Sequence, residues 1–449
     1  MNTKNYYFLP KAFIWSSFLT LLLLFHSVVF PCTVAVVSAK ASREGRPLLW
    51  KNRDTSVEDN MVIYIQGKKW GIIALVNTSD PTGQHVWAGC NDAGLAIMNS
   101  ASSDLAMSEG GMSDNGTFMR RALEECANVE EFERLLLQTN GTRNVGANYG
   151  LIDAQGNACF FETRADSFTK FDANDPKMAP DGYLVRTNFA YTAPTPYTGG
   201  GYIRMERISH LFQQAAGERS LSLPFILQKA ARDLVNEKLH SYPFHQPLPP
   251  SFQPLYLNTS DTINRNSTQA VTVFVGAPSP EKAYLTSMWV MLGQPICTVA
   301  VPVWAGATRV PSALFGQEGA PLNNLAQFVE AYLYPDQRGH MKHYLNLTRL
   351  LTYQGQGVLP LLFNLEQQVL LEAKEMEKKW LGQPPSPEEI NRKSEELANW
   401  VLENLTETFP AEELKSLSSP QITFSTSPWF FSRFAGGPKS TGYRKSLRT

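Results

Sequence analysis

Segments typical of β-strands occur in runs along this 449-residue chain, and the runs are separated by amphipathic helices. Short strands with turn residues between them are predicted at 33–38, 47–51, 61–66, 71–76, 149–153, 158–162, 270–276, 283–292 and 297–303. Residues 86–99 are predicted to form two further strands with a turn at Asn91-Asp92-Ala93-Gly94. Helical patterns fill 117–127, 128–140, 203–214 and 223–239. Asn128 is predicted to cap the second of these helices, with Glu131 in the capping-box position three residues later. Because runs of strands alternate with groups of helices, a layered α+β architecture fits better than repeated βαβ units.

The character of the sequence changes after about residue 320. Two charged, leucine-bearing helical patterns occupy 361–381 and 387–405, and the second has Ser386 in the N-cap position and Pro387 at the first helical position. A basic tail follows from 427 onward. We therefore predict a leader at 1–31, a core domain at 32–319 and a C-terminal helical region at 320–449.

The leader resembles an export signal, because Lys4 and Lys11 precede an uncharged stretch from 12 to 30. That stretch is also about long enough to span a bilayer, so an uncleaved membrane anchor is the alternative. We expect an exported protein in a periplasmic, extracellular or lumenal location, with membrane association through the leader as the second reading. The formal net charge of −1 gives no reason to expect a nucleic-acid partner.

Five cysteines are present, and no two of them have the spacing of a zinc site. The chain also lacks an HExxH motif, a dinucleotide-binding or P-loop glycine pattern, and a GxSxG elbow. We therefore expect neither a metal nor a cofactor.

Cys32 directly follows the leader and opens the first predicted strand. A cut between Pro31 and Cys32 would give one residue both a thiol and a free α-amine, whose reference pKa is about 7.7–8.0. Such a residue is a nucleophile with its own base. Self-cleavage by Cys32 is one hypothesis. A better export site lies at Ala39-Lys40-Ala41, where cutting would remove Cys32. The alternative is a small buried residue at the start of a strand.

Four other side chains have the chemistry to assist a thiol nucleophile. Asp54 ends the second predicted strand, and a hairpin would return it to the chain start, where a carboxylate holds an amine by a charge-assisted hydrogen bond. Asn99 and Asn188 follow strands and offer oxyanion donors. Arg204 begins a helix and is suited to pair with Asp54 or with a substrate carboxylate. Taken singly, a surface ion pair of Asp54 with Arg53, turn asparagines and helix-face salt bridges are the more common explanations of such residues.

The order of these motifs resembles the N-terminal nucleophile (Ntn) hydrolases, in the branch of penicillin acyltransferases and choloylglycine hydrolases. The resemblance runs from residue 32 to about 304. It rests on Cys32-Thr33, Lys51-Asn52-Arg53-Asp54, Asn91-Asp92-Ala93-Gly94-Leu95 with Asn99, Asp153-Ala154-Gln155-Gly156 with Glu162, Thr187-Asn188, and Arg204-Met205-Glu206-Arg207.

The resemblance implies a fold and a set of roles. The fold is the four-layer αββα sandwich, here with a C-terminal helical extension. Cys32 would be the nucleophile and, through its amine, the base, and Asp54 would orient that amine. Asn188 would donate its side chain to the oxyanion, Asn99 would contribute from its backbone, and Arg204 would support the thiol and Asp54. Lys51 stands where the family usually has Arg or Gln, which leaves its role open.

The expected function is that of an exported, autoproteolytic thiol amidase or acyltransferase. It would cleave a linear, non-peptide amide of a small molecule through a Cys32 thioester. An exported cysteine dipeptidase and an inactive, membrane-anchored αββα binding module are the alternatives. The sequence leaves the acyl and amine groups of the substrate open, and also the oligomeric state.

Overall fold

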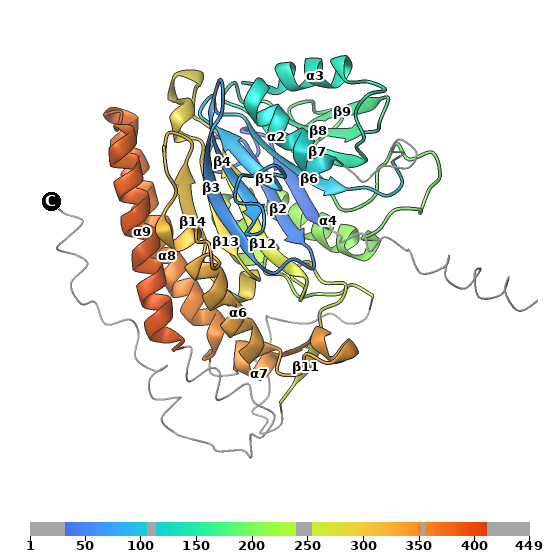
Figure 1. Ribbon diagram of the computed structural model, residues 1–449. Helices are drawn as coiled ribbons and strands as arrows, with labels where there is room; N and C mark the ends of the chain where they lie inside the picture. The colour runs from blue at the N-terminus through green and yellow to red at the C-terminus, as the bar shows by residue number, and fades with distance from the viewer. Residues whose placement is uncertain (1–31, 106–113, 239–253, 353–354, 411–449) are drawn as a thin grey trace, which may run out of the picture.

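The computed structural model describes residues 32–105, 114–238, 254–352 and 355–410 (Figure 1). The predictions for the leader and for the basic tail lie outside these residues. None of the helices in the described ranges is long and apolar enough to cross a membrane.

Six strands form an antiparallel sheet that contains the start of the described chain. Its order is β10 (Tyr183–Arg186), β1 (Thr33–Val37), β2 (Leu48–Asp54), β12 (Thr268–Val275), β13 (Ser287–Leu292) and β14 (Val301–Trp304). The predicted β1–β2 hairpin is confirmed, with Thr33 opposite Asn52. Because β1 is paired on both sides, Cys32 stands at the end of an interior strand.

Seven strands form a second antiparallel sheet that follows the chain order. It contains β3 (Asn60–Gln66), β4 (Gly71–Asn77), β5 (Ala88–Asn91), β6 (Ala96–Ala101), β7 (Ala147–Ile152), β8 (Ala158–Thr163) and β9 (Phe168–Asp172). Strands β1 and β2 contact β6 and β7, so the two large sheets pack against each other. A separate two-stranded ribbon joins β11 (Tyr256–Asn258) to β15 (Tyr344–Asn346).

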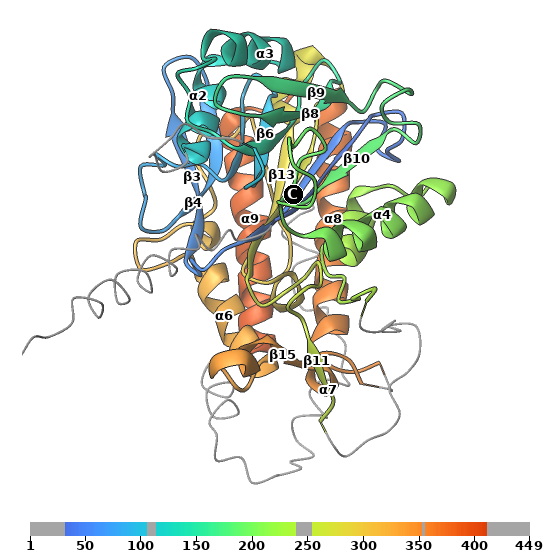
Figure 2. The same cartoon turned by 90° about the vertical axis from the view of Figure 1, so that its right-hand side faces the viewer.

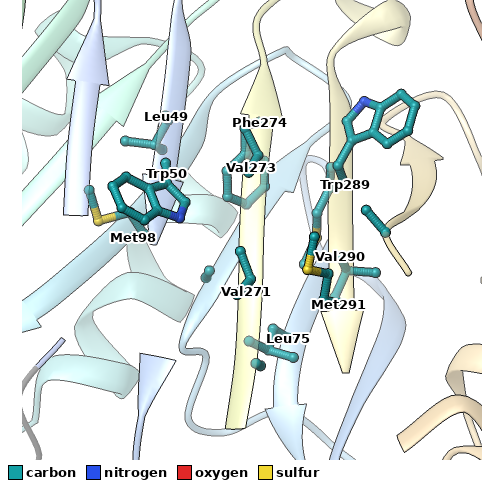
Figure 3. Packing of buried hydrophobic residues seen from close by; sticks show 14 of the residues in the cluster. Leu49, Trp50, Leu75, Met98, Val271, Val273, Phe274, Trp289, Val290 and Met291 are labelled. Carbon is teal, nitrogen blue, oxygen red and sulfur yellow. The ribbon is translucent and has the colours of Figure 1, made fainter. Parts of the chain in front are cut away.

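Strand β2 is buried along its whole length. Trp50 stacks on Phe212, with ring centroids 6.0 Å apart, and Leu49 belongs to the same core cluster. Figure 3 shows that side chains from β2, β4, β6, β12 and β13 belong to this cluster. Full burial of one large apolar side chain contributes about 1.5–3 kcal/mol, so a strand buried on both faces fixes the position of the polar residues at its end.

Helices α2 (Asn115–Glu125) and α3 (Val129–Gln138) lie on the side of the seven-stranded sheet, where α2 contacts β5 and β6 (Figure 1). The predicted cap at Asn128 is confirmed, with the returning bond of Glu131 made to Ala127, the residue before the cap. The Asn128 side chain accepts a hydrogen bond from the Glu131 amide, and the Glu131 carboxylate accepts one from the Ala127 amide.

Helix α4 (Tyr202–Gly217) contacts β10 of the six-stranded sheet. A short helix, α5 (Leu223–Phe225), then continues into a π-helical turn, Ile226–Ala230. The predicted helix 223–239 is therefore too long. The chain leaves the helix after Ala230 because Arg232 turns into the core, where its guanidinium donates to the carbonyls of Leu227, Pro295 and Thr298.

The C-terminal helices form one group that reaches the same six-stranded sheet through α6 and α9. They are α6 (Pro321–Leu333), α7 (Leu347–Leu350), α8 (Val358–Gly382) and α9 (Pro387–Thr408), and the predicted Ser386 cap of α9 is confirmed. Helix α6 contacts β13, α9 contacts β14, and α8 contacts the 3-10 turn Pro295–Cys297. Figure 2 shows α8 and α9 running beside the sheet. The predicted mixed helix-and-sheet architecture is confirmed.

Candidate active site

Cys32 is buried, with 6% of its surface exposed, and lies directly before β1. Strand pairing places Val34 opposite Lys51. Because side chains alternate along a strand, Cys32 projects to the same side as Val34 and Lys51, while Thr33 projects to the other side. All five cysteines are free thiols.

Arg204 is the side chain that joins the candidate residues. Its Nη1 donates to the carbonyl oxygen of Cys32 at 2.8 Å and to Thr33 Oγ1 at 2.6 Å, and its Nη2 donates to Asn188 Oδ1 at 3.1 Å. The guanidinium is fully buried, and this burial lowers the pKa of Arg204 to about 10, with the Asp54 carboxylate opposing the fall. The structure therefore brings Cys32, Asn188 and Arg204 together.

Gly201 explains how Arg204 fits at the first turn of α4. This glycine has φ of 82°, in the left-handed region that favours glycine, and a Cβ there would collide with the Arg204 guanidinium. A side chain at position 201 would therefore displace Arg204 from Cys32.

Asn99 and Asn188 are both held near the end of β6. Asn99 lies on β6, and its Oδ1 accepts a hydrogen bond from Lys51 Nζ at 2.8 Å. Asn188 donates from Nδ2 to the carbonyl oxygen of Ala101, the last residue of β6, at 2.7 Å. A two-way backbone bridge to Gly200 also holds Asn188 in place. Among the described residues, one N–H of the Asn188 carboxamide and both N–H groups of the Asn99 carboxamide are left without a partner, and an oxyanion donor requires such an N–H.

Asp54 is buried at the end of β2 and has one incompletely bonded oxygen. Its Oδ1 accepts a hydrogen bond from Thr268 Oγ1 at 2.7 Å. Its Oδ2 accepts none from the residues that the structure describes, and Arg265 Nη1 lies 3.9 Å away. Burial raises the pKa of Asp54, and the charges of Arg265 and Arg204 act against the rise. Arg204 thus acts on Asp54 through charge, while its hydrogen bonds go elsewhere.

The alternative of a surface ion pair between Asp54 and Arg53 is wrong, since both residues are buried. Arg53 instead donates to Asn60 and to Asn77 Oδ1, and it lies over the Trp87 ring at 4.7 Å. Arg207, in contrast, makes the expected helix-face salt bridges, with Asp233 and Glu237.

Two residues near the site received no role from the sequence. Lys51 is buried and bonds to Asn99, and Arg265 is the closest cation to Asp54. Arg265 lies in a polar loop without a recognisable motif, so no sequence signal singles it out. The charges of Lys51, Arg53 and Arg204 all act on Cys32. Among the described residues, no group of three His, Cys, Asp or Glu side chains is arranged to hold a metal ion.

Comparisons with known proteins give a family and several similar structures. No curated protein matches the chain in sequence. A conjugated bile acid hydrolase from Clostridium perfringens shares 12% identity at a TM-score of 0.38, covering 61% of this chain and 92% of its own. Penicillin V acylase from Agrobacterium tumefaciens shares 12% identity at a TM-score of 0.32, covering 61% of this chain and 85% of its own.

The family model described as acyl-coenzyme A:6-aminopenicillanic acid acyl-transferase matches residues 41–240. This segment includes Asp54, Asn99, Asn188 and Arg204 and begins after Cys32. The resemblance to the penicillin acyltransferase family is thereby confirmed over residues 41–240.

Proposed function

We propose that this protein is an amidase or acyltransferase that uses Cys32 as its nucleophile after a cut between Pro31 and Cys32. The observation that carries the proposal is the pair of hydrogen bonds by which buried Arg204 ties the Cys32 carbonyl to Asn188. A nucleophile must be held at a fixed place relative to its oxyanion donors, and this arrangement does so. The family match supports the same chemistry.

The proposed reaction has two steps. The Cys32 sulfur attacks the amide carbon, the α-amine of Cys32 takes the thiol proton, and the oxyanion receives N–H groups from Asn188 and Asn99. The C–N bond then breaks, the α-ammonium returns the proton to the leaving amine, and a thioester remains. Water or an acceptor amine attacks the thioester and releases the acyl group. Asp54 Oδ2, buried without a hydrogen bond from the described residues, is suited to hold the α-ammonium.

We propose further that the architecture is the four-layer αββα sandwich. Helices α2 and α3 would form one outer layer, and α4 with the C-terminal helices the other. We also propose export and a small-molecule amide as substrate. The basic, then apolar leader supports the export.

The experiment compares the wild-type protein with Cys32→Ala and with Cys90→Ala. Cys90 is a matched control because it is also buried but lies on β5, in the other sheet. Intact mass and N-terminal sequencing give the mature chain start, and release of p-nitroaniline from N-acyl p-nitroanilides of increasing acyl length gives turnover. We expect a chain that starts at Cys32, and no turnover in Cys32→Ala with unchanged thermal unfolding. Turnover by Cys32→Ala, or a mature chain that begins beyond Cys32, would overturn the proposal.

A further inference from the structure

Lys51 is a buried cation next to the proposed nucleophile. It is 2% exposed and lies on β2, opposite Val34 of β1 on one side and Thr272 of β12 on the other. Cys32 is two residues before Val34, so Lys51 and Cys32 are diagonal neighbours on one face of the sheet. Such neighbours are about 7–8 Å apart, within reach of a long side chain.

The Lys51 ammonium bridges the two large sheets. Its Nζ donates to Asn99 Oδ1 on β6 and to the carbonyl oxygen of Trp87, which precedes β5, each at 2.8 Å. Both acceptors are neutral, and none of the ion pairs among the described residues includes Lys51. A buried charge without a paired carboxylate is costly, so its position needs an explanation beyond packing.

Hydrogen bonds connect Cys32 to Lys51 through Arg204, Asn188 and strand β6. Arg204 links the Cys32 carbonyl to Asn188, and Asn188 links to Ala101 at the end of β6. Asn99, two residues earlier on the same strand, links to Lys51. Lys51 lies beside β1, the strand that Cys32 begins. Both predicted oxyanion donors are therefore held by a buried cation, Asn188 by Arg204 and Asn99 by Lys51.

Lys51 also fixes which end of the Asn99 carboxamide faces it. An ammonium has donors and no acceptor, so it accepts only the oxygen end of an amide as partner. The opposite orientation would place two donors against each other. With Oδ1 committed to Lys51, the Nδ2 end is the end that remains for the oxyanion.

We infer that Lys51 is a positioning residue that orients Asn99 as a side-chain oxyanion donor and places a positive charge beside the Cys32 thiolate. The inference rests on the proposed function. It assigns to the Asn99 side chain the role that the family resemblance gives to the Asn99 backbone, and it gives a role to the position where this chain departs from the family's Arg or Gln.

A lysine at this position differs from an arginine in its response to pH. Burial lowers the pKa of Lys51 to about 8; the charge of Cys32 opposes the fall, Arg53 adds to it and Asp54 opposes it. The other groups packed on Lys51 are neutral: Val34, Thr272, Asn99 and the Trp87 carbonyl. An arginine stays charged throughout the accessible pH range. Activity should therefore fall as the pH rises through about 8, when Lys51 loses its proton.

The test measures kcat and KM from pH 6 to pH 10 for the wild-type protein, Lys51→Arg, Lys51→Met and Glu330→Gln. Glu330 is the matched control, because burial raises its pKa to about 8 as well and it hydrogen-bonds Gln294, away from the site. We expect Lys51→Met to lose about 10²–10³-fold in kcat with a smaller change in KM, as for loss of one oxyanion donor. Lys51→Arg should stay active at pH 7 and keep its activity above pH 8. Glu330→Gln should keep the wild-type decline.

A second measurement separates this inference from the proposed function. The rate of alkylation of Cys32 by iodoacetamide, followed by peptide mass at pH 7, does not depend on turnover. We expect slower alkylation in Lys51→Met and near wild-type alkylation in Lys51→Arg.

Each combination of results has a distinct meaning. If the wild-type protein shows no turnover, the proposed function fails, and the alkylation rates still decide whether Lys51 acts on Cys32. If the wild-type protein turns over and Lys51→Met retains kcat within threefold, the inference fails and the function stands. If Lys51→Met does not fold, an unchanged alkaline decline in Lys51→Arg would overturn the inference by itself.

Discussion

A buried ion pair joins α8 to the segment that follows the π-helical turn Ile226–Ala230. Arg232 donates from Nη1 to Glu366 Oε2 at 2.7 Å and from Nη2 to Glu366 Oε1 at 2.9 Å. The side chains are only 2% and 0% exposed. Glu366 lies on α8 and also accepts the Ala300 amide at 3.2 Å. We predict that Glu366→Ala destabilises the whole protein, because it leaves the Arg232 charge buried without a carboxylate.

The magnitude follows from what remains after the substitution. The guanidinium keeps the carbonyls of Leu227, Pro295 and Thr298 as acceptors but loses both charge-assisted bonds. Removal of one partner from such a pair typically costs about 3–5 kcal/mol. The free energy of unfolding of a typical domain is about 5–15 kcal/mol, so this loss is a large part of it. The double variant Arg232→Met, Glu366→Leu buries no charge and should cost less than Glu366→Ala alone.

The assay is equilibrium unfolding in urea, followed by far-UV circular dichroism and by tryptophan fluorescence. Trp380 on α8 packs edge-on against Trp304 of β14, with ring centroids 5.0 Å apart, so the contact between this helix and the sheet contributes to the fluorescence of the nine tryptophans. Both signals should show one transition. Glu375→Ala, at an exposed position of α8, is the control and should change the unfolding free energy by less than about 0.5 kcal/mol. A loss below about 1 kcal/mol for Glu366→Ala, or two separate transitions in the wild-type protein, would refute the reasoning.

Three further predictions concern single side chains. Burial raises the pKa of Glu330 to about 8 from an ordinary 4.5. The stability that comes from its neutral form is therefore fully present below pH 4.5 and is lost as the pH rises through 8, an effect of at most roughly 5 kcal/mol. Glu330→Gln should raise the melting temperature at pH 9 and have little effect at pH 4. Asp54→Asn should lower kcat/KM for an N-acyl p-nitroanilide by about 10–100-fold, the value of a lost charge-assisted hydrogen bond to the α-ammonium, and undiminished turnover would contradict the role of Asp54. Leu362→Ala, at a fully buried position of α8, should cost about 2–5 kcal/mol in urea unfolding, and a smaller loss would mean that α8 packs loosely.

The features that the sequence predicts well are those decided by neighbours along the chain. The Asn128 and Ser386 caps each depend on a residue three positions later, and the structure has both. The β1–β2 hairpin likewise follows from two strand patterns and the turn between them. These elements form from local hydrogen bonds, which a single sequence displays directly.

The features that the sequence could not predict depend on contacts between distant segments. Lys51 contacts Asn99, which is 48 positions away. The helix ends after Ala230, where Arg232 turns into the core and binds Glu366, 134 positions away. Neither contact leaves a periodic pattern. Arg265 faces Asp54 only because its loop precedes β12, which pairs with β2. The role of a residue that depends on contacts between distant segments can be recognised only once the packed structure is known.

The place of α8 and α9 at the end of the described chain has a consequence for the order of events during synthesis. The strands that would carry Cys32 and its neighbours are made first, while the helices that pack on β14 and on the Pro295–Cys297 turn are made later. Until α8 and α9 are present, the surface that they bury has no cover, and Arg232 lacks the Glu366 carboxylate. An activity that requires the finished core therefore begins only after these two helices have packed.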